Sequence, residues 1–225
     1  LDILSGRAII NFPTVSTYVF IFFVISIALI LANRFVALHN NTEKLNEDLS
    51  NFNAASRRFV PFEFLKMLEK ESILDVNLGD QIQKEMTILF SDIRAFTELS
   101  ENMTPKENFD FINSYLNKVG PVIREHSGFI DKYIGDAIMA FWNAPLEVQY
   151  HERHAVLSAL RMQEALRDFN IQHDTTLLVG IGIHTGHAVV GNVGSQERVN
   201  YTVLGETVNL ASRVESLTKK YGVEI

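Results

Sequence analysis

Two aspartates occupy places where a strand is expected to end. Asp92 directly follows the apolar run Met86–Ser91, and Asp136 lies in a Gly135-Asp136 pair between two further apolar runs. Strand ends and hairpin turns expose side chains to water and to ligands. Mg²⁺ favours one or two carboxylates that leave room for phosphate oxygens, so a converging pair could hold it. Each aspartate alone is more typical of a turn or a helix cap than of a metal site, so the assignment needs further motifs.

Four segments supply those motifs. In chain order they are residues 90–97 (FSDIRAFT), 132–140 (KYIGDAIMA), 182–186 (GIHTG) and 201–213 (YTVLGETVNLASR). Together they closely resemble the class III nucleotidyl cyclases, and the resemblance extends over about residues 59–225. Because several independent motifs contribute in the right order, the resemblance is far more specific than any one of them.

The resemblance implies a role for each matching residue. Two Mg²⁺ or Mn²⁺ ions would be held by Asp92 and Asp136 with the backbone of Ile93. The other implied roles concern the nucleotide: the backbone of Ile93, Ala95, Phe96 and Thr97 wraps the triphosphate, Lys132 and Thr202 read the base, Asn209 orients the ribose, and Arg213 stabilises the transition state. The resemblance also implies a head-to-tail homodimer. One subunit would supply the aspartates, and the other would supply Lys132, Thr202, Asn209 and Arg213.

The implied reaction is attack of the ribose 3′-hydroxyl of ATP on its α-phosphorus, which gives cyclic AMP and pyrophosphate. A pair of metal ions suits this reaction because it activates the hydroxyl and neutralises charge on the leaving oxygens. Arginine has a planar fork of donors that fits phosphate oxygens, which suits Arg213. Asn209 lies four residues earlier and therefore on the same face of the expected helix.

The base preference follows from donors and acceptors. Lysine offers only donors, so Lys132 suits adenine N1, and the Thr202 hydroxyl can accept from the adenine amino group. A guanine-reading site would favour a carboxylate at position 132. Threonine at position 202 resembles a bacterial subgroup that is often linked to bicarbonate sensitivity. Two alternatives remain: a guanylate cyclase, and a degenerate cyclase-like module that only binds nucleotide or dimerises in a receptor.

Two departures from the family pattern stand out. Gly180 occupies a position at which some relatives carry a phosphate-binding arginine. The family also uses a lysine beyond the third helix of the domain, and the sequence ends before it. We therefore expect a C-terminally truncated catalytic domain, which leaves its activity as a fragment open.

The elements that must position these residues form an expected α+β domain over residues 86–225. Strands are expected at Met86–Ser91, Phe129–Ile134, Ala137–Trp142 and Val199–Leu204, with two more at Leu177–Ile183 and His187–Val193 around a turn at Thr185-Gly186. Helices are expected at Pro105–His126, His151–Asn170 and Thr207–Tyr221. Strand–helix–strand–strand–helix–strand order predicts a ferredoxin-like sheet with helices on one face.

The N-terminal part has a different character. No charged residue lies between Arg7 and Arg34, so we predict a transmembrane helix at Thr14–Leu38 after a juxtamembrane segment, residues 1–13. A signal peptide or a buried soluble helix is the alternative. Leu38, Leu45, Phe52 and Phe59 recur every seven residues, which predicts a parallel coiled coil over residues 39–60 or a single amphipathic helix. Residues 61–85 are the expected linker.

Composition narrows the class of protein. The chain has 225 residues, a net charge of −7 and no cysteine, which argues against nucleic-acid binding and excludes disulfides, thiolate metal sites and cysteine nucleophiles. We expect a cell inner-membrane location with the catalytic domain in the cytoplasm, where ATP is found. The charges flanking the apolar segment favour that orientation only weakly.

Overall fold

The computed structural model describes residues 15–56, 62–72, 75–101, 103–195 and 197–225. The chain divides into two compact units, Leu1–Phe59 and Val60–Ile225. The expected juxtamembrane segment, together with Phe59 at the end of the heptad pattern, lies outside the described residues.

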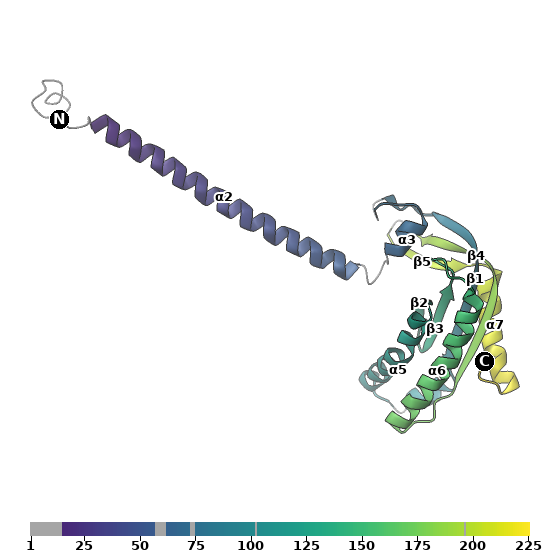
Figure 1. Cartoon of the computed structure of the whole chain (residues 1–225). Coiled ribbons are helices and arrows are strands. Elements are labelled where there is room, and N and C mark those ends of the chain that lie inside the picture. The colour runs from purple at the N-terminus through teal and green to yellow at the C-terminus, as the bar shows by residue number, and fades with distance from the viewer. Residues whose placement is uncertain (1–14, 57–61, 73–74, 102, 196) are drawn as a thin grey trace, which may run out of the picture. The chain divides into compact units, whose positions relative to one another are not determined.

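The described part of the first unit is one long helix, α2 (Val15–Ser56, 42 residues) (Figure 1). At 1.5 Å per residue it is about 60 Å long, roughly twice the thickness of a hydrocarbon core. Its apolar segment and its heptad segment therefore form one uninterrupted helix. Among the described residues it is the one helix long and apolar enough to cross a membrane, with a mean hydropathy of 2.5 in its best window.

The heptad positions of α2 bury nothing within the described chain. Leu38, Leu45, Leu49 and Phe52 are all more than half exposed. An apolar stripe of this kind gains stability only when another surface covers it. The coiled coil stays a prediction. The apolar heptad side chains of α2 that would form its interface are exposed.

The second unit is an α+β domain built on a five-stranded sheet with strand order β2-β3-β1-β4-β5. All four neighbouring strand pairs are antiparallel. Its elements are α3 (Phe62–Met67), β1 (Gln81–Ile93), α4 (Phe96–Ser100), α5 (Pro105–Glu125), β2 (Phe129–Ile134), β3 (Ala137–Trp142), α6 (His151–His173), β4 (Val179–Gly194), β5 (Val199–Leu204) and α7 (Glu206–Tyr221). The order of β1 to β4 with α5 and α6 confirms the predicted ferredoxin-like arrangement.

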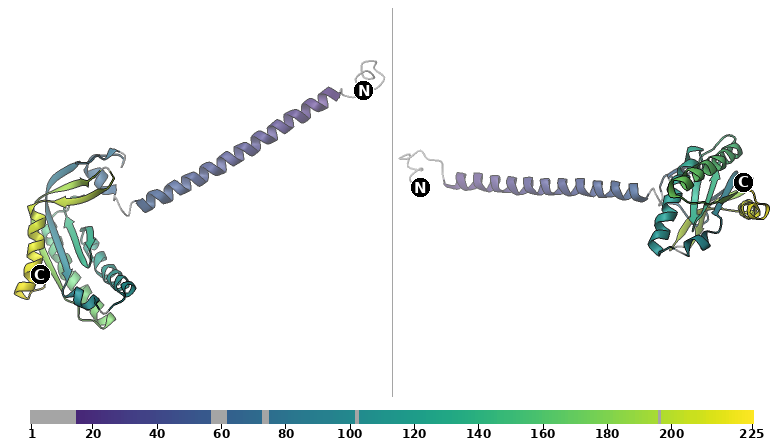
Figure 2. Two further views of the ribbon diagram at one scale, coloured as in Figure 1. Left: turned by 180° about the vertical axis from the view of Figure 1, so that it is seen from behind. Right: turned by 90° about the horizontal axis from the view of Figure 1, so that it is seen from below.

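Helices cover both faces of the sheet, so the prediction of helices on one face is wrong (Figure 2). Alternate residues of β1 point to opposite sides, as the pleat requires. Leu89 and Ile93 join a core with α5 and α6, whereas Met86 and Ile88 join a second core with α3 and α7. The sequence pattern suggested one buried face because it did not show on which side α7 would pack.

The expected turn at Thr185-Gly186 is also wrong, because β4 runs without a break from Val179 to Gly194. It pairs with β1 along its length, from Ile93↔Val179 to Gln81↔Gly191. The glycines serve close packing instead. A Cβ on Gly182 would stand 2.1 Å from the Glu215 backbone nitrogen of α7, so only glycine lets the helix approach the strand this closely.

The central strand β1 begins at Gln81, five residues before the expected Met86. Residues 81–85 of the expected linker thus belong to the sheet. Gly79 lies in a turn just before this strand, and its φ of 88° explains the glycine.

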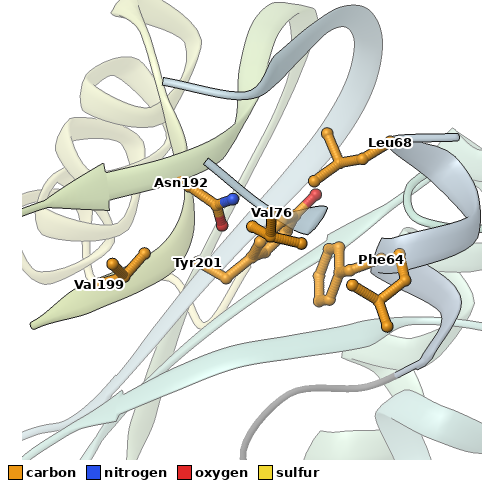
Figure 3. Close-up of a pocket in the computed structure, with 7 residues that line it drawn as sticks. Phe64, Leu68, Val76, Asn192, Val199 and Tyr201 are labelled. Carbon is orange, nitrogen blue, oxygen red and sulfur yellow. The ribbon is translucent and has the colours of Figure 1, made fainter. Parts of the chain in front are cut away.

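Helix α3 packs directly against the sheet. Phe64 is 2% exposed, and its ring centroid lies 3.5 Å from that of Tyr201 on β5. Beside this contact is an apolar pocket of about 280 Å³, lined by Phe64, Leu65, Leu68, Val76, Asn192, Val199 and Tyr201 (Figure 3). The helix nearest in sequence to α2 therefore touches the strand that carries Thr202.

Candidate active site

Asp92 and Asp136 meet at one end of the sheet. Asp92 lies near the end of β1, and Asp136 lies in the turn that joins β2 to β3, the strand beside β1. The Ile93 backbone N–H donates to Asp136 Oδ2 at 3.2 Å. Partial burial, followed by the charge and hydrogen bond of Asp136, raises the pKa of Asp92 to about 6. The other charged group acting on Asp92 is Glu215 of α7, which also raises its pKa.

This pair has the donor chemistry of a magnesium site. Two carboxylates that repel each other and meet no offsetting cation gain stability when a divalent cation binds between them. The described residues contain no cluster of three or more histidine or acidic side chains able to hold a metal alone. Mg²⁺ does not require one, since it often takes one or two carboxylates and completes its shell with water and phosphate oxygens.

The raised pKa of Asp92 makes stability depend on pH. A folded-state pKa near 6, above the ordinary value of 3.8, means that the folded state favours the protonated form. The contribution of Asp92 to stability is therefore greatest below about pH 4 and is lost as the pH rises through about 6. Because Asp92 is only partly buried and solvent screens its charge, we expect Asp92→Asn to be more stable than wild type by only about 1 kcal/mol at pH 7.5 in EDTA. Denaturant unfolding checks this, and a difference of the same size at pH 4 would contradict it.

The segment after Asp92 turns sharply into the short helix α4. Ala95 has the left-handed φ of 55°, and no side chain caps the start of the helix. The Phe96 ring packs against the core around α5 and α6, so this residue offers its backbone, not its side chain, to a ligand. The structure thus places Ile93, Ala95, Phe96 and Thr97 together beside the carboxylates.

Lys132 and Thr202 form a second group. They come from β2 and β5, the opposite edges of the strand order, yet Lys132 Nζ donates to Thr202 Oγ1 at 2.9 Å. The sheet must curl strongly to bring its two edges this close. Asp131 completes the group: its Oδ2 lies 3.2 Å from Lys132 Nζ and accepts a hydrogen bond from Thr202 Oγ1 at 2.9 Å. Burial raises the pKa of Asp131, and Lys132 and Thr202 oppose that rise.

Asn209 and Arg213 lie on the exposed face of α7. Ala211 and Thr218 are the buried side of the helix, against the sheet. No hydrogen bond or ion pair joins Asn209 or Arg213 to another side chain in the part of the chain described. The eight predicted nucleotide- and metal-binding positions outside α7 fall into two groups, and in the described residues neither Asn209 nor Arg213 makes a side-chain hydrogen bond or ion pair with either group.

The packing around Gly180 explains why this chain lacks the arginine that some relatives carry at this position. A Cβ on Gly180 would stand 2.4 Å from Thr218 Oγ1 and 2.9 Å from Glu215 Oε1. These side chains of α7 fill the space in which a larger residue at position 180 would begin. A larger residue here would therefore need the side chains of Thr218 and Glu215 to turn away.

Two residues of this region escaped the sequence analysis. Asp131 directly precedes Lys132, and ordinary strand alternation would put the two side chains on opposite faces. A bulge between Ile130 and Lys132 brings them to the same place. Glu215 follows Arg213 by two residues and approaches Asp92 only through the packing of α7 on β4. The proximity of Asp131 to Lys132 was the one signal available in the sequence.

Comparison with known proteins agrees with this geometry. The family model for the adenylate and guanylate cyclase catalytic domain matches residues 78–225. An adenylate cyclase of Anabaena cylindrica is 42% identical over 197 residues, which are 84% of this chain and 38% of that protein. The chain thus spans well under half the length of this relative.

Solved structures give the same result. The guanylyl cyclase Cya2 is 42% identical with a TM-score of 0.57, over 60% of this chain and 71% of that one. The adenylyl cyclase CyaB from P. aeruginosa is 35% identical with a TM-score of 0.53, over 61% and 74%. The sheet, the paired aspartates and these likenesses agree, and the chain belongs to the adenylate and guanylate cyclase catalytic-domain family, the class III cyclases.

Proposed function

We propose that this protein is a membrane-anchored adenylate cyclase that converts ATP to 3′,5′-cyclic AMP and pyrophosphate as a homodimer. The observation that carries the choice of substrate is the contact between Lys132 and Thr202, at 2.9 Å, in a chain that also pairs Asp92 with Asp136. The first pair offers groups for a purine edge, and the second offers ligands for the metal that accompanies a triphosphate.

Overall similarity does not choose between ATP and GTP. Relatives named adenylate cyclase and guanylyl cyclase reach the same 42% identity. The choice therefore rests on the side chains. Lys132 can only donate, which suits the acceptor N1 of adenine and opposes the N1–H of guanine. Thr202 is 7% exposed, so little water competes with the base for its hydroxyl. A mismatch between this hydroxyl and the purine edge is therefore costly, which favours one base over the other.

The chain's own residues would bind and orient the nucleotide. Asp92 and Asp136 hold the metal side of the triphosphate, and the backbone turn at Ala95 lies along its phosphates. Bound Mg²⁺ or Mn²⁺ would lower the pKa of the ribose 3′-hydroxyl and offset the charge that develops on the phosphate oxygens. Asn209 would hold the ribose, and the Arg213 guanidinium would pair with the α-phosphate as its charge grows. Nucleophile and phosphorus belong to one molecule, so positioning supplies much of the catalysis.

Sites shared between two subunits would explain why these groups make no contact within one chain. Both charged groups that act on Asp92 are carboxylates, and Arg213 makes no ion pair in the described chain. A head-to-tail partner would bring its Arg213 and Lys132 toward the aspartates. The exposed heptad face of α2 would hold the two chains parallel, as a coiled coil continuing from the membrane helix.

Helix α3 gives a route for regulation. It lies close in sequence to α2 and packs through Phe64 on Tyr201, next to Thr202. A change in the pairing of the two α2 helices would move α3 and with it the strand that reads the base. We place the protein in the inner membrane with this domain in the cytoplasm.

The proposal is tested by product analysis of the full-length protein with ATP or GTP and Mg²⁺ or Mn²⁺. Cyclic AMP should dominate. Cyclic GMP as the main product would favour a guanylate cyclase, and no product from either nucleotide would favour a degenerate module.

A charge reversal at the base site sharpens the test. Lys132→Glu replaces the donor for adenine N1 by an acceptor, so we expect kcat/KM for ATP to fall about 100-fold and the preference for ATP over GTP to shrink at least tenfold. Lys106→Glu, on the exposed surface of α5, is the matched control and should leave the preference unchanged. An unchanged preference in Lys132→Glu would remove Lys132 from base recognition.

A further inference from the structure

Asp131 is almost completely enclosed, although it is charged. Its side chain is 1% exposed, and both of its contacts fall on a single oxygen, Oδ2. The second oxygen, Oδ1, has no hydrogen-bond partner among the described residues. A buried carboxylate that leaves one oxygen unpaired costs stability, so its presence calls for a reason beyond packing.

Donor counting fixes the direction of each hydrogen bond in this group. A threonine hydroxyl has one hydrogen to donate and two lone pairs that accept. Lysine has donors only, so in the 2.9 Å contact between Lys132 and Thr202 the hydroxyl must accept. An ionised Asp131 has acceptors only, so in the 2.9 Å contact between Thr202 and Asp131 the hydroxyl must donate. The single hydrogen of Thr202 is therefore used.

What remains on Thr202 is one lone pair. An isolated threonine could turn its hydrogen toward an acceptor or its lone pair toward a donor, and would serve either purine. With its hydrogen held by Asp131, Thr202 can only accept. The adenine 6-amino group is a donor and can hydrogen-bond to the remaining lone pair of Thr202. The guanine 6-oxygen is an acceptor, so it would face this lone pair without a hydrogen between them and would be repelled.

We propose that Asp131 is a specificity-determining positioning residue, which holds the Thr202 hydroxyl as an acceptor and so excludes guanine from the base site. Asp131 acts through Thr202 and does not touch the nucleotide. The inference rests on the proposed function, since it assigns Lys132 and Thr202 to the purine base.

The local backbone supports this role. The bulge between Ile130 and Lys132 inserts Asp131 as the extra residue of β2. Bulges redirect side chains at the cost of a regular ladder. As a result, two consecutive residues of β2 both contact the hydroxyl of Thr202 on β5. Lys132 donates a hydrogen bond to it, and Asp131 accepts one from it.

A matched pair of variants in the full-length protein tests the inference. Asp131→Ala frees the Thr202 hydrogen, so the ratio of kcat/KM for ATP to that for GTP should fall about tenfold, through a higher value for GTP as well as a lower value for ATP. Asp131→Asn can place its amide oxygen where Oδ2 lies and keep both contacts. It should retain the wild-type ratio to within about twofold.

A merely structural role predicts a different result. Loss of packing would lower turnover of both nucleotides alike and leave their ratio unchanged, so an unchanged ratio in Asp131→Ala overturns the inference. Loss of selectivity in Asp131→Asn equal to that in Asp131→Ala also overturns it, because charge and not acceptor geometry would then be responsible.

Binding separates this inference from the proposed function. The ratio of dissociation constants for ATP and GTP with Mg²⁺ is measured by displacement of a fluorescent nucleotide. If the wild type binds ATP selectively but forms no cyclic product, the proposed function fails, and a tenfold loss of binding selectivity in Asp131→Ala still supports the role of Asp131. A wild type without preference for ATP in either measurement overturns the inference.

Discussion

Asparagine in place of Asp92 is expected to lower kcat for ATP about 1000-fold, because the pair then offers a divalent cation one charge in place of two. The neutral amide is a weaker ligand in the same position. It also removes a charge that partial burial, followed by the interaction with Asp136, disfavours at this position, the two effects that raise the pKa of Asp92 to about 6. Initial rates measured across a range of Mg²⁺ concentrations should show a loss that higher Mg²⁺ recovers only in part.

Another aspartate of this chain provides the control for the loss of activity in Asp92→Asn. Asp110→Asn makes the same chemical change on the exposed surface of α5 and should keep nearly full activity. Asp92→Asn should also be at least as stable as wild type without metal, so unfolding cannot explain its inactivity. Activity above about a tenth of wild type in Asp92→Asn would contradict a metal-holding role for this carboxylate.

Local signals explain why parts of the fold were predictable. The hairpin of Phe129–Ile134 and Ala137–Trp142 has the expected bounds, because short apolar runs flank a Gly135-Asp136 turn. The bounds of β5 are likewise as expected. Helix α5 starts at Pro105 with Thr104 as its cap, a signal carried by neighbouring residues.

Long-range packing explains what the sequence could not show. Gly186 looks like a turn residue, yet a Cβ there would meet Thr207 Oγ1 at 2.9 Å, so the glycine serves the contact between β4 and α7. The partner of a glycine across a sheet face is not visible in a local pattern. The face on which α7 packs was mispredicted for the same reason.

In the candidate site, too, some residues could be predicted from the sequence and others depend on long-range packing. The resemblance identified Asp92 and Asp136, and the structure brings them together. It could not reveal Asp131, because a bulge and the curl of the sheet are needed to carry that carboxylate to Thr202. Nor could it reveal that Glu215 takes the space beside Gly180.

Activity restored by mixing two inactive variants is the second large effect that we expect. Asp92→Ala and Arg213→Ala chains should each be nearly inactive as homodimers. In a mixed dimer with shared sites, one site joins the intact aspartates of one chain to the intact Arg213 of the other, and the second site loses both. Equal mixing makes about half of the dimers mixed, so activity should recover to about a quarter of wild type.

The reason lies in where the groups stand within one chain. The charged groups that shift the pKa of Asp92 are both carboxylates. Arg213 is exposed on α7 and has no ion-pair partner in the described chain. If one chain held a whole site, neither variant could supply what the other lacks, and mixing would recover nothing. Co-expression with two different affinity tags, followed by tandem purification, isolates the mixed dimer. Its activity should then be about half that of wild type, whereas an inactive mixed dimer would refute sites shared between subunits.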